Sequence, residues 1–218
     1  MFTKFQLNGE QLKWIALFTM TIDHIGAIIF PQYLILRIIG RIAFPIFAFL
    51  LAQGMIYTHN PYKYLTRLGI FAILSEIPFD YAFQTSIIDM QHQNIFFTLF
   101  LGALSIYAIQ LSDKKENAYF TAMGIALLAE VLNCDYGLTG VLIVVSFYVL
   151  KEKKIYQFIT LTIFSILMGY IQIYAIFACV PIALYNEKRG KKRKWLFYVY
   201  YPLHLLAIKG IWLFMFNL

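Results

Sequence analysis

The sequence predicts an all-α, polytopic membrane protein with about nine transmembrane helices, each near the length that a bilayer requires. The composition is the first observation behind this prediction, because 61% of the 218 residues are hydrophobic and only 13% are charged. Soluble domains are typically about 45–50% apolar and about 25% charged. The mean hydropathy of +0.70 agrees. No stretch is long and polar enough for a soluble domain, so we expect one transmembrane domain over residues 1–218.

Turn and proline signals divide the chain into apolar segments. Pro31 should end the first and Pro78 the third, and Pro45 predicts a kink inside the second. Residues 79–93 have the composition of a longer polar loop. The short segments between residues 118 and 185 could instead be helical hairpins or longer helices counted twice. We expect helices at 12–30, 33–58, 62–77, 94–111, 118–132, 138–150, 155–168, 170–185 and 195–216.

Basic residues gather in alternate loops, and this sets the expected orientation. The basic loops are 58–63, 112–117, 151–154 and 186–194. The opposite loops hold Asp80, Asp89 and Asp135 but no Lys or Arg. By the positive-inside tendency, the basic loops and the N-terminus are cytoplasmic. The net charge of +7 is therefore a topology signal that does not indicate a nucleic-acid partner, and we expect a multi-pass protein of a bacterial cytoplasmic membrane.

Several ionisable side chains interrupt the apolar segments. Such a residue costs about 2.5–3.5 kcal/mol at the bilayer centre on insertion scales, and it is a functional-site hypothesis by default. Arg37 and Arg41 are four residues apart and share a helix face, so they should pair with an acidic residue. The plain alternative is that they only hold helices together. The group expected near the outer surface comprises Asp23, His24, Arg37, Arg41, Glu76, Asp80 and Asn94.

A second group of polar residues should lie nearer the cytoplasm. Lys13, Lys63 and Arg67 form a basic fringe there. Tyr200 and His204, four apart in the last segment, could line a passage or make ordinary polar contacts. The only two cysteines of the sequence, Cys134 and Cys179, lie in different segments, which favours neither a disulfide framework nor a zinc site. We expect no metal.

The spacing of Lys13 and His24, with ten residues between them, resembles the Lys/Arg and His spacing in the first helix of acyltransferase-3 enzymes. Four longer runs resemble the TraX family over most of the chain. They are RIIGRIAFPIFAFLLAQG, YLTRLGIFAILSEIPFD, NIFFTLFLG and FYVYYPLHLLAI. The resemblance implies a membrane acetyltransferase, similar also to heparan-glucosaminide acetyltransferases. TraX proteins acetylate the N-terminus of conjugative pilin.

The resemblance implies acetyl-CoA as a cytoplasmic co-substrate and an acceptor across the bilayer, either a peptide N-terminus or a glycan. Lys13, Arg67 and the loop lysines suit the phosphates of coenzyme A. Tyr200 and His204 would line the donor passage. An imidazole suits proton transfer at neutral pH, so His24 is the expected general base, although it could instead carry the acetyl group.

The remaining polar residues have alternative roles around His24. Glu76 or Asp23 would orient the imidazole. Arg41, Asn94 or a backbone amide could hold the thioester oxyanion. Arg37 and Arg41 could instead bind phosphate or an acceptor carboxylate. Acids, histidine and arginines within a helical bundle also fit a small proton-coupled transporter or channel, although no internal repeat supports it. A third possibility is an assembly subunit without chemistry.

Overall fold

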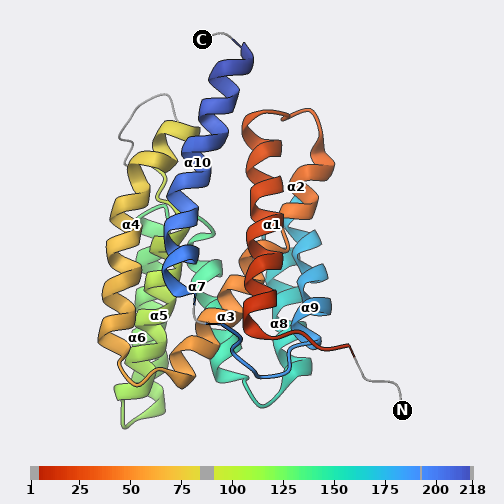
Figure 1. Ribbon diagram of the computed structural model, residues 1–218. Helices are drawn as coiled ribbons and strands as arrows, with labels where there is room; N and C mark the ends of the chain where they lie inside the picture. Colours follow the sequence, from red (N-terminus) through yellow and green to blue (C-terminus); the bar gives the residue numbers. More distant parts are fainter. Residues whose placement is uncertain (1–4, 84–90, 192, 217–218) are drawn as a thin grey trace.

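The structure is a computed structural model that describes residues 5–83, 91–191 and 193–216, and over these residues it is all-α, with no strand (Figure 1). This confirms the all-α part of the predicted fold class. The α-helices and one 3₁₀ helix, η1, follow in the order α1 (Gly9–Ile28), α2 (Leu34–Gly40), α3 (Ala43–Tyr57), α4 (Pro61–Phe83), α5 (Ile95–Leu111), α6 (Lys115–Val131), α7 (Gly137–Val149), α8 (Lys154–Leu167), η1 (Tyr170–Ala178), α9 (Cys179–Ala183) and α10 (Lys194–Phe216).

All nine predicted segments are helical, but two of them are divided. The segment predicted at 33–58 contains α2 and α3, which are separated at Arg41 and Ile42. The predicted kink at Pro45 is therefore wrong in position. Pro45 instead lies in the first turn of α3, where a missing backbone N–H costs little. The segment predicted at 170–185 contains η1 and α9.

The prediction that Pro78 ends the third segment is wrong. Helix α4 continues through Pro78 to Phe83, so residues 79–83 are helical and do not belong to a loop. A proline removes one backbone donor, and packing of α4 against α5 and α10 holds the helix around it. Of the predicted loop, residues 84–90 lie outside the described residues.

The helices run back and forth between the two ends of one bundle (Figure 1). Helix α1 packs against α2, α3 and α10, and α5 packs against α4, α6 and α7. The core between them is apolar, with Phe49, Ile46, Met55 and Phe147 fully or almost fully buried. We call the end at which α1 begins the basic end. Its loops carry Lys114, Lys151, Lys153, Lys188, Arg189, Lys191 and Arg193, and Lys63 lies there in the first turn of α4.

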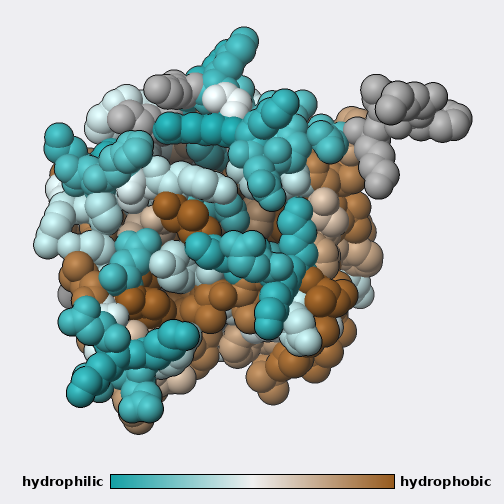
Figure 2. Space-filling view, turned by 90° about the horizontal axis from the view of Figure 1, so that it is seen from below, coloured by the Kyte–Doolittle hydropathy of each residue, from teal (hydrophilic) through white to brown (hydrophobic). Residues whose placement is uncertain are grey.

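Figure 2 looks onto the basic end, where hydrophilic residues gather, with hydrophobic residues toward the sides of the molecule. By length and composition, two stretches among the described residues could cross a membrane, Leu34–Tyr57 and Trp195–Phe216. Helices α5, α7 and α8 and the η1–α9 stretch are apolar but shorter. The two longer stretches are consistent with a membrane location.

The start of α1 is fixed by its own sequence and by the loop before α10. Asn8 and Gln11 form a capping box, in which the Gln11 N–H donates to Asn8 Oδ1 and the Asn8 N–H donates to Gln11 Oε1, both at 2.9 Å. The Gly9 N–H donates to the Lys188 carbonyl at 2.7 Å. These bonds hold the loop across the start of α1, and they place Arg189 beside the cavity described next.

Candidate functional site

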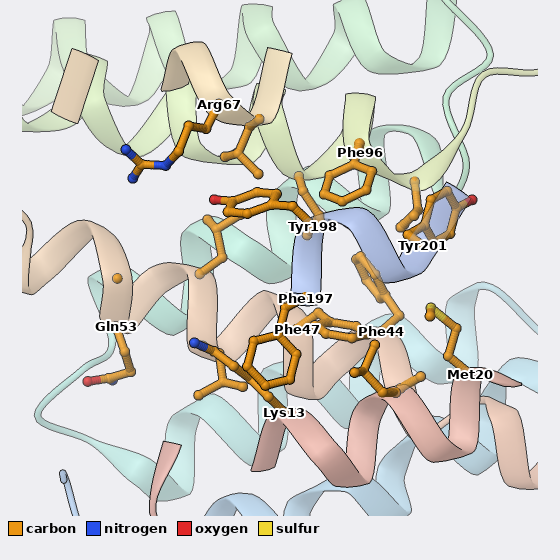
Figure 3. Close-up of a pocket in the computed structure, with 18 of the residues that line it drawn as sticks. Lys13, Met20, Phe44, Phe47, Gln53, Arg67, Phe96, Phe197, Tyr198 and Tyr201 are labelled. Carbon is orange, nitrogen blue, oxygen red and sulfur yellow. The ribbon is translucent and has the colours of Figure 1, made fainter. Parts of the chain in front are cut away.

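A cavity of about 800 Å³ lies among α1, α2, α3, α4, α5 and α10. In Figure 3, Lys13, Gln53 and Arg67 lie toward one side of it and Met20 and Tyr201 toward the other. Aromatic rings lie between these two groups and make the middle of the cavity apolar. They belong to Phe44, Phe47, Phe96, Phe197 and Tyr198.

The cavity is lined by cations at the basic end. Lys13 Nζ lies 5.1 Å from the centre of the Phe197 ring, and the Arg67 guanidinium lies 5.4 Å from that of Tyr64. Such cation–π contacts hold the long side chains along the cavity wall. Lys63 and Arg189 line the same end. Four cations beside one cavity form a site suited to a polyanion.

His24 lines the cavity about three turns along α1 from Lys13. Eleven residues of helix correspond to about 16 Å, at about 1.5 Å per residue. The Nδ1 atom of His24 lies 2.6 Å from Nε2 of His204 on α10, and the two rings stack with centroids 4.9 Å apart. The rings of Phe83 and Tyr201 meet the His24 ring edge-on, with centroids 5.4 and 6.2 Å from its own. The cavity thus joins a cationic end to an imidazole in aromatic surroundings.

Asp23, Arg37 and Arg41 form a charged cluster beside His24. Asp23 Oδ2 accepts from Nη1 of Arg37 at 2.7 Å and from Nη2 of Arg41 at 2.5 Å. Arg41 also donates to the hydroxyl of Tyr136 at 3.3 Å. A Cβ on Gly40 would lie 2.1 Å from that of Asp23, so only glycine allows this approach of α1 to α2. The three side chains together carry a net charge of +1 at the cavity wall.

The comparison with protein families decides how the chain is classified. The sequence model of the TraX protein family matches residues 8–212, nearly the whole chain. The chain belongs to the TraX family.

Two curated relatives extend this result. The chain is 26% identical over 234 residues to the probable fimbrial assembly protein FimC of Dichelobacter nodosus, covering 92% of this chain and 94% of that protein. It is also 37% identical over 151 residues to an uncharacterized protein of Rickettsia prowazekii (strain Madrid E). That alignment covers 66% of this chain and 56% of the relative. No solved structure matches this TraX-family chain.

The structure brings six of the predicted site residues of this TraX-family chain to the cavity. His24, Asp23, Arg37 and Arg41 line it together, and Lys13 and Arg67 line its basic end. The prediction that the arginines face an acidic residue is confirmed. Asp23 is the acid that the ion pairs join to both arginines.

Glu76 and Asn94 form a separate cluster behind the cavity wall. Asn94 Nδ2 donates to Glu76 Oε2 and, at 2.8 Å, to the Ala72 carbonyl. Its Oδ1 accepts from the Phe96 N–H and caps α5. Neither Glu76 nor Asn94 lines the cavity. The predictions that Glu76 orients His24 and that Asn94 holds an oxyanion are therefore wrong for this structure, because the pair fastens α4 to α5.

Neither Tyr200 nor His204 lines the cavity, so the structure does not place them along the predicted donor passage. The Tyr200 hydroxyl lies 2.8 Å from that of Thr21, and His204 contacts His24, so both bind α10 to α1. Asp23 contacts arginines and is not the partner of His24. Helical periodicity gave no signal for a pairing between residues 180 positions apart.

Sequence reasoning missed several residues that line the cavity. Arg189 stood only as a topology signal within a basic loop. At the end away from the basic end, His92 Nε2 lies 3.9 Å from Asp135 Oδ1, and both residues line the cavity. Tyr136 joins them, with a left-handed φ of 65° that turns the chain into α7. The turn sequence NCDYG signalled only a loop.

Proposed function

We propose that this TraX-family chain is a multi-pass membrane acetyltransferase that moves an acetyl group from cytoplasmic acetyl-CoA to an acceptor on the other side. One observation carries the proposal: a single cavity extends from the four cations of the basic end to the imidazole of His24. Its dimensions and lining suit a long, thin donor with an anionic nucleotide and an apolar arm.

The outer surface of the bundle supports the membrane part of the proposal. Large apolar side chains cover the outward faces of several helices, an arrangement that would be unfavourable in water over so large an area. The basic residues at one end support a cytoplasmic location for that end. The exposed apolar residues include Phe18 on α1, Ile70 and Ile73 on α4, Phe120 and Val131 on α6, Ile163 on α8 and Leu203 and Phe214 on α10.

The basic end is the proposed site for the nucleotide of acetyl-CoA. Lys13, Lys63, Arg67 and Arg189 would bind its phosphates, because lysine and arginine are the usual donors to phosphate oxygens. The aromatic middle of the cavity would enclose the pantetheine arm. The thioester would then lie near His24, about 16 Å along α1 from Lys13.

His24 would act as the general base. The nucleophilic nitrogen or oxygen of the acceptor attacks the thioester carbonyl while His24 takes its proton. The carbon–sulfur bond then breaks, and the thiolate of coenzyme A leaves and receives that proton from His24. Arg37 is the more exposed of the two arginines, with 30% of its side chain accessible. It would stabilise the oxyanion of the tetrahedral intermediate.

The acceptor would approach from the end where His92, Asp135 and Tyr136 line the cavity. A relative covering nearly the same length is named a probable fimbrial assembly protein. The amino terminus of an exported fimbrial or pilin subunit is therefore the acceptor we propose. We also propose that the Lys13–His24 arrangement is shared with acyltransferase-3 and heparan-glucosaminide acetyltransferases.

Transfer of an acetyl group across the membrane of sealed vesicles tests the proposal. Proteoliposomes would carry acetyl-labelled CoA on the side of the basic loops and a short peptide with a free amino terminus on the other. We expect labelled peptide with the unaltered protein and a loss of about 10²–10⁴-fold with His24→Ala. The matched control is Phe18→Ala, on the same helix but facing outward with 73% of Phe18 exposed. Undiminished transfer by His24→Ala would remove His24 as the base.

The same vesicles test the transporter alternative, which a cavity lined near both ends also favours. A proton flux that needs no acetyl-CoA, together with no labelled peptide, would support transport and contradict the acetyltransferase proposal. Labelled peptide without such a proton flux would exclude the transporter alternative.

A further inference from the structure

The imidazole of His24 is held by a second imidazole. The Nδ1 atom of His24 lies 2.6 Å from Nε2 of His204, and Nδ1 of His204 lies 3.0 Å from the Tyr200 carbonyl oxygen. The carbonyl can only accept a hydrogen bond, so Nδ1 of His204 carries a proton. In a neutral imidazole the other nitrogen, Nε2, then has a lone pair and accepts.

The direction of the second hydrogen bond follows from the first. Because Nε2 of His204 accepts, Nδ1 of His24 must carry the proton and donate. Neutral His24 then has its lone pair on Nε2. His24 lines the cavity and His204 does not, so Nε2 of His24 is the basic nitrogen that a molecule in the cavity can reach.

The surroundings favour two neutral rings over a charged pair. His204 is buried, with 7% of its surface accessible, and aromatic rings pack against both histidines. The neighbouring charged cluster of Asp23, Arg37 and Arg41 already has one excess positive charge. An additional buried cation without an acidic partner would be costly there. Two of the neighbouring carboxylates are engaged elsewhere, Asp23 by the two arginines and Glu76 by Asn94.

We propose that His204 is a positioning residue that holds His24 in the tautomer whose Nε2 accepts the proton of the attacking nucleophile. This inference rests on the proposed function of His24. In this role His204 replaces the carboxylate that commonly orients a catalytic histidine. It touches neither the donor nor the acceptor, because it lies behind His24 when seen from the cavity.

The same bond strengthens when His24 takes up the proton. The imidazolium donates from Nδ1 to His204 Nε2, and a hydrogen bond from a charged donor is stronger than one from a neutral donor. His204 keeps its own proton on the Tyr200 carbonyl throughout. The Tyr200 ring stacks on His204 with centroids 5.1 Å apart, and its hydroxyl is held by Thr21 on α1. The orienting ring is therefore fixed at both ends.

Nuclear magnetic resonance of the full-length protein in lipid bilayers tests the tautomer without acetyl-CoA. Histidines would be labelled with ¹⁵N, and the His24 signals assigned by their loss in His24→Ala. We expect a protonated Nδ1 and an unprotonated Nε2 on His24 in the unaltered protein. His204→Leu removes the acceptor and should shift His24 toward the Nε2-protonated tautomer that imidazole prefers in water. His204→Gln places an amide oxygen near the former Nε2 and should keep Nδ1 protonated.

Transfer assays with the same variants add the catalytic readout. We expect His204→Leu to lower kcat at least about tenfold with little change in KM, since general base catalysis contributes about 10²–10⁴-fold. His204→Gln should stay within a few-fold of the unaltered protein, as should the control Leu203→Ala, at a position 58% exposed on the same helix.

Each failure has a distinct meaning. An Nε2-protonated His24 in the unaltered protein would overturn the inference, even if the variants failed to fold. So would a His204→Leu variant that folds and keeps both tautomer and kcat. If the tautomers are as expected but the unaltered protein transfers no acetyl group, the proposed function fails and with it the catalytic role of His204.

Discussion

Asp23 and His24 are neighbours in the sequence and both line the cavity, yet they bind different partners. One residue of helix turns the side chain by about 100°, from 3.6 residues per turn. Asp23 therefore faces α2, where it binds Arg37 and Arg41 through one carboxylate oxygen. His24 faces the cavity and α10, where it pairs with the neutral ring of His204.

The difference shows how one helix separates structural charge from reactive groups. Both arginines of the cluster bind the Asp23 carboxylate, so this carboxylate is not available as a base. The histidine pair has no net charge and leaves one nitrogen facing the cavity. We infer that the cluster mainly fixes the junction of α1 and α2, and that the pair serves chemistry.

The largest effect on stability should come from Asp23→Ala. This change leaves Arg37 and Arg41 without their carboxylate, and removing one partner of a buried ion pair costs about 3–5 kcal/mol. Equilibrium unfolding in mixed micelles would measure the loss. The comparison variant is His24→Ala, which removes one hydrogen bond and should lower the free energy of unfolding by only about 1 kcal/mol. Equal losses in the two variants would contradict the separation of roles.

The next effect should come from Gly40→Ala, which tests the close approach of the cluster directly. The new Cβ would lie 2.1 Å from the Asp23 Cβ, so α1 and α2 must move apart. Such overpacking costs about 1–3 kcal/mol in free energy of unfolding.

Gly210→Ala is the matched control for that variant. A Cβ there has no neighbour within 4 Å, and Gly210 lies within α10. Replacing a helical glycine with alanine should raise the free energy of unfolding by about 0.5–1 kcal/mol. If Gly40→Ala is as stable as Gly210→Ala, the approach of α1 to α2 is looser than the structure has it.

Much of the fold could be predicted from the sequence because hydropathy reports directly on helix length. The nine apolar segments and their turns were recognisable for this reason. Whether a single proline ends a helix could not be predicted in the same way. Pro78 stays inside α4 because α4 packs against α5 and α10, and only the folded bundle supplies these neighbours.

The site was predictable in part for a related reason. An ionisable residue inside an apolar segment is conspicuous, and this identified Lys13, Asp23, His24, Arg37 and Arg41. Their partners depend on how distant helices rotate about their axes. The sequence therefore predicted Glu76 or Asp23 as the partner of His24, whereas α10 supplies His204.

Lys13→Ala should have the smallest effect, and it extends the comparison along α1. Lys13 lies three turns before His24 at the basic end of the same cavity, where it would bind a phosphate of the donor. Exposed ion pairs contribute about 0.2–1 kcal/mol, so KM for acetyl-CoA should rise up to about fivefold while kcat stays the same. The rise should shrink with added salt, which screens charges near solvent. Lys151→Ala removes an exposed charge of the same end away from the cavity and should leave KM unchanged. A fall in kcat for Lys13→Ala would mean that Lys13 and His24 do not divide binding and chemistry as we propose.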